Sequence, residues 1–237
     1  MKNPLNRTAL DVAVRDYVVQ HILDNGLKAG DALPSEIQLA ENLGVGRSSI
    51  REAVKKLQSL GIVEVRHGTG LFVRESNFDP LREIVGYVIR FNTRALEELG
   101  EIRFLLEGAA IEEVVSLIGP GDIQRLEDVL AAWRIADQEG KACDDLDNQF
   151  HHILYSPLGN NMLLMLLEEF WTVFAQVDDP LLHEEKPTGE ELENHRSILE
   201  AVKARDADLA GRRLRSHFMH LQECIVRVRD KKASVDQ

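Results

Sequence analysis

Hydrophobic positions in the first 74 residues recur at helical spacing in three segments and at strand spacing in two. Helices are predicted at 8–25, 35–43 and 46–60, and each segment is followed directly by a glycine, the residue that most readily ends a helix. The β-type runs IVEVR (62–66) and GLFVR (70–74) flank a short glycine-containing connection, which predicts a hairpin. The chain therefore begins with three helices followed by a hairpin.

From residue 79 onward the strand pattern disappears and helical spacing dominates. Glycine, proline and short polar breaks divide this part into about seven helices; the breaks lie at 92–93, 119–121, 140, 157–160, 186–187 and 206. The fold class expected is mainly α. Its parts are a winged helix-turn-helix with a β-hairpin wing at 1–75, a linker at 76–78, an all-helical bundle at 79–232 and a tail at 233–237.

Composition supports two folded domains of different charge. The 237 residues are 44% hydrophobic and 29% charged, which is ordinary for a globular protein and excludes a disordered chain. The net charge of -12 is unevenly divided: residues 1–74 carry 10 Lys and Arg against 8 Asp and Glu, so they are net +2 and the remainder is net -14. Attraction to phosphate is local, so the acidic total does not exclude nucleic acid binding by the first domain.

Cysteine use and hydropathy indicate the compartment. Cys143 and Cys224 form no CxxC pair, so they are expected to be reduced, buried and structural rather than a disulfide framework or a thiolate zinc site. No apolar run approaches the roughly 18 to 20 residues of a membrane span, and the first residues carry charges where a signal peptide needs an apolar stretch. A cytoplasmic protein without membrane contact is expected.

Candidate DNA-contacting residues lie at the start of the third helix. The segment LGVGR is a turn between the second and third helices, and Arg47, Ser48, Ser49 and Arg51 follow it. A recognition helix enters the major groove by its N-terminal end, where arginine pairs with guanine and serine hydroxyls bind phosphate. The alternative is that this stripe is only the solvated face of an amphipathic helix.

Candidate metal ligands lie in the second domain. Asp147 and His151 are four residues apart, so they project from one face of a helix. His195 and His217 each lie 11 residues from the predicted break at Asp206, and an antiparallel helical hairpin brings such positions level. The alternatives are a salt bridge or a surface position for the first pair and core packing for the other two. Three further histidines have no assigned partner: His152, His183 and His220.

The segment LPSEIQLAENLGVGRSSIREAVKKLQSLGIVEVRHGTGLFV closely resembles the winged-helix signature of the GntR family of bacterial regulators. The resemblance implies a homodimer that binds double-stranded operator DNA. The positions it assigns to DNA contact are Arg47, Ser48, Ser49, Arg51, His67 and Gly68. This chain departs from the pattern at Ile37, where many relatives carry an arginine that touches DNA, and Ile37 is expected to be packed instead.

The second domain resembles the effector-binding FCD domain of the FadR subfamily. The segments that carry the resemblance are EIRFLLE, DNQFHHIL, GNNML and NHRSILEAVKARDADLAGRRLRSHF. It implies that Asp147, His151, His195 and His217 bind a divalent metal ion and that the metal coordinates a small carboxylate effector. Imidazole and carboxylate suit Zn, Ni, Mn or Fe(II), so the sequence does not specify the ion.

Arg103, in EIRFLLE, is the candidate partner for the effector carboxylate, and its alternative role is an ion pair with Glu107 four residues on. Trp171 either lines the effector cavity or fills the core.

Three functions follow from these patterns. The first is a ligand-responsive transcription regulator, a repressor, whose operator binding is altered by the metal-bound effector. The second is a metal-dependent enzyme that uses the three histidines and the aspartate to activate water, but the sequence supplies no general base for it. In the third, the metal is purely structural and the effector binds elsewhere. We adopt the first of these hypotheses, the transcription regulator, and it assigns no catalytic residues to the chain.

Overall fold

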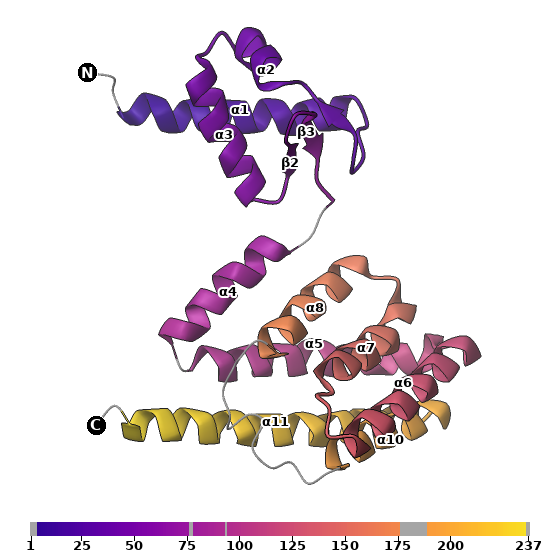
Figure 1. Cartoon of the computed structure of the whole chain (residues 1–237). Helices are drawn as coiled ribbons and strands as arrows, with labels where there is room; N and C mark the ends of the chain where they lie inside the picture. Colours follow the sequence, from indigo (N-terminus) through magenta and orange to yellow (C-terminus); the bar gives the residue numbers. More distant parts are fainter. Residues whose placement is uncertain (1–3, 76–77, 93, 176–188, 236–237) are drawn as a thin grey trace. The chain divides into compact units, whose positions relative to one another are not determined.

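A computed structural model describes residues 4–75, 78–92, 94–175 and 189–235, and the chain divides into two compact units, Met1–Pro80 and Leu81–Gln237. The expected fold class, mainly helical with a small antiparallel sheet in the first unit, is confirmed (Figure 1). No helix within the described ranges combines the length and the apolar character that crossing a bilayer requires.

The first unit contains the three predicted helices and the hairpin. Its elements are α1 (Pro4–Asp24), β1 (Ala32–Leu33), α2 (Glu36–Leu43), α3 (Arg47–Ser59), β2 (Val63–Arg66) and β3 (Gly70–Val73). The sheet is antiparallel with strand order β1-β3-β2, and β1 pairs Ala32 with Phe72 and Leu33 with Leu71. Strand β1 was not predicted, because two residues are too few to show an alternating pattern.

Local signals explain where α2 and α3 begin and end. Ser35 forms a capping box with Gln38, and Gly44 ends α2 in the left-handed conformation with a φ of 64°. Helix α3 begins after Gly46, which provides no side-chain cap. The backbone N–H groups of its first turn are therefore not satisfied by a capping side chain, which is the condition under which a helix N-terminus binds anions.

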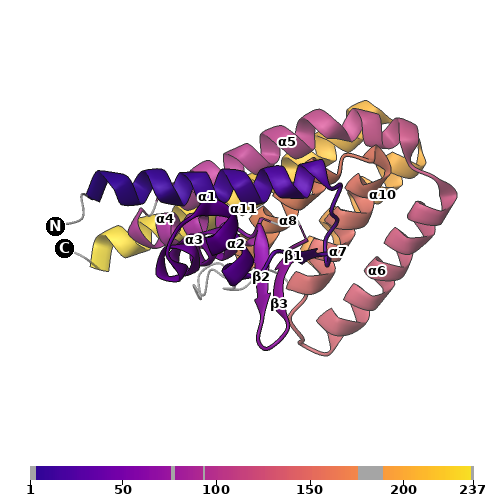
Figure 2. The ribbon, with the colours of Figure 1, turned by 90° about the horizontal axis from the view of Figure 1, so that it is seen from above.

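The second unit is a helical bundle. The helices that the structure describes in it are α4 (Asp79–Phe91, beginning at the unit boundary), α5 (Ala95–Leu117), α6 (Pro120–Gln138), α7 (Asp144–Tyr155), α8 (Asn161–Ala175), α10 (Glu190–Lys203) and α11 (Ala207–Val235), with the 3-10 turn η1 (Ser156–Leu158). Helix α11 packs along α5 and against α10, and α6 packs on α7 (Figures 1 and 2).

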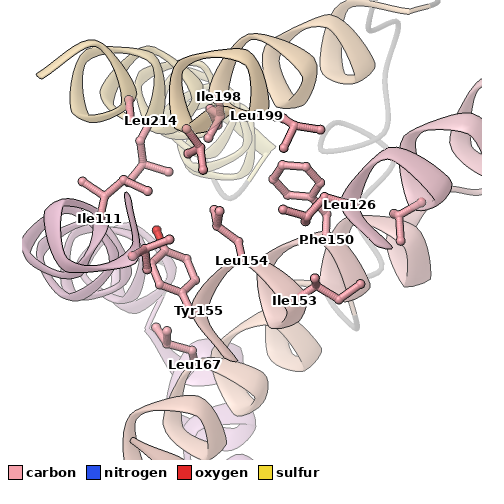
Figure 3. Packing of buried hydrophobic residues seen from close by; sticks show 14 of the residues in the cluster. Ile111, Leu126, Phe150, Ile153, Leu154, Tyr155, Leu167, Ile198, Leu199 and Leu214 are labelled. Carbon is pink, nitrogen blue, oxygen red and sulfur yellow. The ribbon is translucent and has the colours of Figure 1, made fainter. Parts of the chain in front are cut away.

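One apolar core joins six of these helices. Figure 3 shows side chains from α5, α6, α7, α8, α10 and α11 meeting, among them Ile111, Leu126, Phe150, Leu167 and Leu214. Phe150, Leu154 and Ile198 are fully buried. Because these side chains fix the inner faces of α7 and α10, they also fix the polar residues that alternate with them on those faces.

The predicted break at Asp206 is confirmed as the turn between α10 and α11. Arg205 adopts a φ of 58°, and the Asp206 carboxylate accepts a hydrogen bond from the Leu209 backbone N–H at 2.8 Å, which starts α11. The Arg205 guanidinium donates to the carbonyls of Val115 and Ile118, the latter at 2.6 Å. The turn is thereby fastened to the end of α5.

Candidate functional site

The four predicted metal ligands come together inside the second unit. Asp147 and His151 project from α7, His195 from α10 and His217 from α11, and one ligand atom from each lies within 4.8 Å of all the others. The Asp147 Oδ1 atom is 2.8 Å from His195 Nε2 and 3.8 Å from His151 Nε2. The hairpin of α10 and α11 therefore brings the two distant histidines level, as the spacing around Asp206 predicted.

The outer ring nitrogens of two histidines determine which atoms face inward. His195 Nδ1 lies 2.7 Å from the backbone carbonyl of Glu191, and His151 Nδ1 lies 2.9 Å from Glu107 Oε2. Both neighbours accept hydrogen bonds, so in neutral rings the proton belongs on Nδ1 and both Nε2 atoms carry lone pairs. These Nε2 atoms are 3.4 Å apart and face the Asp147 carboxylate. Three electron-pair donors that face one another need a shared cation or proton between them.

Burial and the neighbouring groups keep Asp147 and His217 in the protonation states in which they bind a metal ion. His151 and His195 are fully buried, and His217 is 8% exposed. Burial lowers the pKa of His217 well below its usual value, and the neighbouring His195 and His151 lower it further. Burial raises the pKa of Asp147, but the close contacts with His195 and His151 outweigh burial and hold the pKa well below its usual value. At neutral pH the carboxylate is ionised and His217 is neutral, as metal binding requires.

Arg103 lies beside the cluster in an ion pair. Its Nε atom donates to Glu107 Oε1 at 2.7 Å, and both residues are buried. The structure thus contains the Glu107 pair that the sequence offered as an alternative, and the effector-binding role of Arg103 stays a prediction. Trp171 is 2% exposed, donates from Nε1 to the same Glu107 oxygen at 3.1 Å and lies 5.7 Å from the His151 ring, centre to centre.

Glu107 is the residue of this site that sequence reasoning did not connect to the metal ligands. The sequence indicates Glu107 only as a partner of Arg103 on its own helix. Its contact with His151 joins α5 to α7 across 44 residues, and no local spacing predicts such a contact.

The predicted DNA-contacting residues lie at one end of α3 and at the tip of the hairpin. Arg47, Ser48 and Arg51 are exposed and Ser49 is half-buried, while the opposite face of α3 packs in the core of the first unit. Arg51 donates from Nε to Glu36 of α2 at 3.0 Å, so its guanidinium is held near the helix start. Both hairpin residues are exposed too, His67 and Gly68, and Gly68 has a φ of 74°, which favours glycine.

Three expectations need correction or completion. Ile37 is not packed but 46% exposed, because the buried face of α2 is formed by Leu39 and Ala40 and residue 37 points elsewhere around the helix. His152 has a partner after all, since its Nδ1 lies 2.6 Å from Glu168 Oε1. Cys143 is only partly buried. His183 and the side chains of His220 and Cys224 lie outside the described residues.

These features define the class of protein. A helix-turn-helix with an exposed, arginine-bearing recognition helix, joined to a helical unit with a buried polar cluster, is the architecture of a DNA-binding transcription regulator that responds to a ligand. Residues 98–220 match the FCD domain and residues 10–73 match the bacterial regulatory proteins of the gntR family. The chain belongs to the GntR family of transcription regulators, carries an FCD domain, and is not an enzyme.

Relatives of known description extend along most of the chain. The chain is 25% identical over 210 residues to the HTH-type transcriptional regulator LutR of Bacillus subtilis, covering 86% of this chain and 96% of that protein. It is 28% identical over 216 residues to the Glc operon transcriptional activator of Escherichia coli, covering 86% and 84%. A solved structure of a Streptococcus agalactiae GntR protein aligns with a TM-score of 0.69 and 30% identity over 90% of this chain and 99% of that one.

Proposed function

We propose that this regulator belongs to the FadR subfamily and binds a divalent metal ion through Asp147, His151, His195 and His217. The observation that carries the proposal is the inward-facing set of donors: two Nε2 atoms 3.4 Å apart and a carboxylate oxygen 2.8 Å from one of them. Donors in that arrangement repel one another unless a cation or a shared proton lies among them. Zn, Ni, Mn and Fe(II) all accept imidazole and carboxylate ligands.

The effector in this proposal is a small organic acid that binds at the same site. Four protein donors without a thiolate leave a divalent ion able to accept a further oxygen ligand, and the carboxylate of an organic acid supplies such an oxygen. The Arg103 guanidinium, on the neighbouring face of α5, is proposed to add a positive charge for that carboxylate. A purely structural metal is the competing function.

Chelation separates these two roles of the metal. If the metal binds the effector, removing it with a chelator abolishes the stabilisation that an acid such as L-lactate or acetate gives to the Zn²⁺-loaded protein, measured as the shift in Tm. If the metal is only structural, chelation lowers the Tm of the protein, but the shift produced by the acid persists.

The operator interface is proposed to comprise Arg47, Ser48, Ser49 and Arg51 of α3 with His67 and Gly68 of the hairpin. Replacing Arg47 or Arg51 with alanine is expected to weaken operator binding by about 1–3 kcal/mol, because each arginine is able to make a bidentate contact to guanine. The measurement is fluorescence anisotropy with an operator fragment enriched from randomised duplex DNA.

The matched control for this measurement is Lys141→Ala, which removes an exposed positive charge from the second unit. It should leave operator affinity unchanged. Equal losses on the enriched operator and on random DNA would show that the arginines contact only phosphate, and unchanged operator affinity would remove them from the interface.

A homodimer is proposed from the outer face of α4. Ile84, Tyr87, Val88 and Phe91 are spaced to form one stripe, and all four side chains are exposed, Phe91 by 86%. The residues that pack against the bundle core from this helix are Val85 and Ile89. An apolar stripe of this kind is suited to face the same stripe of a second copy about a twofold axis.

Phe91→Asp is expected to raise the dimer dissociation constant at least about tenfold, because a buried uncompensated carboxylate costs more than the 1.4 kcal/mol that a tenfold change requires. Sedimentation equilibrium measures the change. Leu23→Asp, an equally drastic change at an exposed leucine of the first unit, is the control that should leave the dimer intact. A Phe91→Asp protein that dimerises like the wild type would place the interface elsewhere.

Repression and activation of transcription are the two possible effects of operator binding. The Escherichia coli relative is described as an activator, so a repressor role for this chain stays a prediction. Transcription from a reporter carrying the enriched operator, with and without the regulator, distinguishes repression from activation.

A further inference from the structure

Glu107 is a fully buried carboxylate with two different sets of neighbours. Its Oε1 atom accepts hydrogen bonds from Arg103 Nε at 2.7 Å and from Trp171 Nε1 at 3.1 Å. Its Oε2 atom lies 2.9 Å from His151 Nδ1, on the side of the imidazole away from the other metal ligands. One carboxylate on α5 therefore touches α7 and α8 as well as its own helix.

We propose that Glu107 is a positioning residue for the metal centre: it holds the proton of His151 on Nδ1 and so presents Nε2 to Asp147, His195 and His217. The inference rests on the metal binding proposed above and goes beyond it, because Glu107 is not a ligand itself. A carboxylate behind a ligating histidine fixes the tautomer, fixes the ring orientation and raises the basicity of the ligand nitrogen.

The contact between Glu107 and His151 is specific to this pair. The two atoms lie at ion-pair distance, though without the alignment of an ideal hydrogen bond, and neither has a hydrogen-bond partner elsewhere among the described residues. Each is therefore the polar neighbour that the other needs in a buried environment. Arg103 donates to the other oxygen of Glu107 at 2.7 Å, and this adjacent positive charge favours the ionised carboxylate, which is a hydrogen-bond acceptor.

The surroundings of His151 leave its ring little freedom to turn. The Trp171 ring lies 5.7 Å from it and the Tyr155 ring is parallel to it at 6.5 Å, centre to centre. Tyr155 also donates its hydroxyl to the Glu107 backbone carbonyl at 3.3 Å, which ties α7 to α5 at this point. The ring orientation is thus enforced from the side by aromatic packing and from behind by Glu107.

If Glu107 served only as the counter-ion of Arg103, it would need only one of its two carboxylate oxygens. The pair with Arg103 uses Oε1, whereas the second oxygen faces the histidine. The two roles differ in a measurable way: a positioning residue acts on the metal only through His151, and a counter-ion acts on the stability of the whole unit.

The test is Zn²⁺ affinity of the full-length protein, measured by competition with a chromogenic chelator. Glu107→Gln keeps the shape and an acceptor for Trp171 but offers an amide N–H₂ to His151, which favours the wrong tautomer. It should weaken Zn²⁺ binding about 10- to 100-fold. Glu113→Gln, at an exposed carboxylate of the same helix, should leave the affinity unchanged.

Double variants show whether the effect passes through His151. Adding Glu107→Gln to His151→Ala should weaken Zn²⁺ binding no further, whereas adding it to His217→Ala should cost the same factor as in the wild type. Equal additional losses in both backgrounds, or no loss from Glu107→Gln alone, would overturn the positioning role. A wild-type protein that binds no Zn²⁺ would instead refute the metal function itself.

A measurement on the wild-type protein needs no substitution, so it tests the proposal even if the Glu107→Gln protein fails to fold. ¹⁵N NMR of the metal-free wild-type protein should show the proton of the His151 ring on Nδ1 rather than on Nε2. A His151 ring that carries its proton on Nε2 would contradict the proposal.

Discussion

Replacing Asp147, His151 or His195 with alanine is expected to lower the affinity of the protein for Zn²⁺ by about a hundredfold or more. Structural Zn²⁺ sites with four protein donors, as in zinc-finger peptides, bind with an apparent free energy of about 10–16 kcal/mol, so one donor of four accounts for roughly 3 kcal/mol. The loss should be similar for the three residues, because their ligand atoms belong to one cluster. Chelator competition measures it.

His152→Ala is the matched control for this prediction. His152 is the next residue on α7 but is exposed and lies against Glu168, so its removal should leave Zn²⁺ affinity unchanged. If His152→Ala and His151→Ala had the same effect, Zn²⁺ would be binding to surface histidines rather than to the buried cluster.

Arg103→Met is expected to lower the free energy of unfolding by about 3–5 kcal/mol. Removal of one member of a buried ion pair leaves the other charge without compensation, and this costs far more than the pair contributes while intact. Arg103 and Glu107 are 3% and 0% exposed, so water cannot replace the lost partner. Urea denaturation of the metal-free protein measures the change.

The double variant Arg103→Met with Glu107→Gln removes both charges and retains an acceptor for Trp171. It should be more stable than Arg103→Met alone, since no unpaired charge remains. If the double variant instead lost the sum of the two single losses, the two side chains would act independently, and the network around Glu107 would not be a coupled unit.

The helix-turn-helix could be predicted from the sequence because its signals are local. Ser35 with Gln38, and the glycines at 44 and 61, mark helix ends within one turn of the residues they cap. The helix predicted at 46–60 is observed as Arg47–Ser59. Strand β1 was missed because its pairing with β3 depends on residues some 40 positions away. Ile37 was misplaced because an isoleucine is usually packed, whereas helical geometry directs this one outward.

The four candidate metal ligands could be predicted from the sequence for a related reason. Asp147 and His151 are four residues apart on one helix, and the two other histidines are symmetric about a single turn, so both pairs follow from helical geometry. The residues behind the ligands follow from no such rule. Glu107 and Trp171 reach His151 from α5 and α8, and their convergence is a property of how the bundle packs. Tertiary packing decides those contacts, and it leaves no trace in local spacing.

In the proposed mechanism, a metal-bound acid at the buried cluster controls DNA binding by the other unit. The most direct test of this mechanism is the affinity of the Zn²⁺-loaded protein for the enriched operator fragment, measured by fluorescence anisotropy with and without a panel of small organic acids. The wild type should change its operator Kd in the presence of at least one acid, and His195→Ala should bind the operator with no response to that acid. The same response in both proteins would show that the acid acts at another site and would contradict the mechanism.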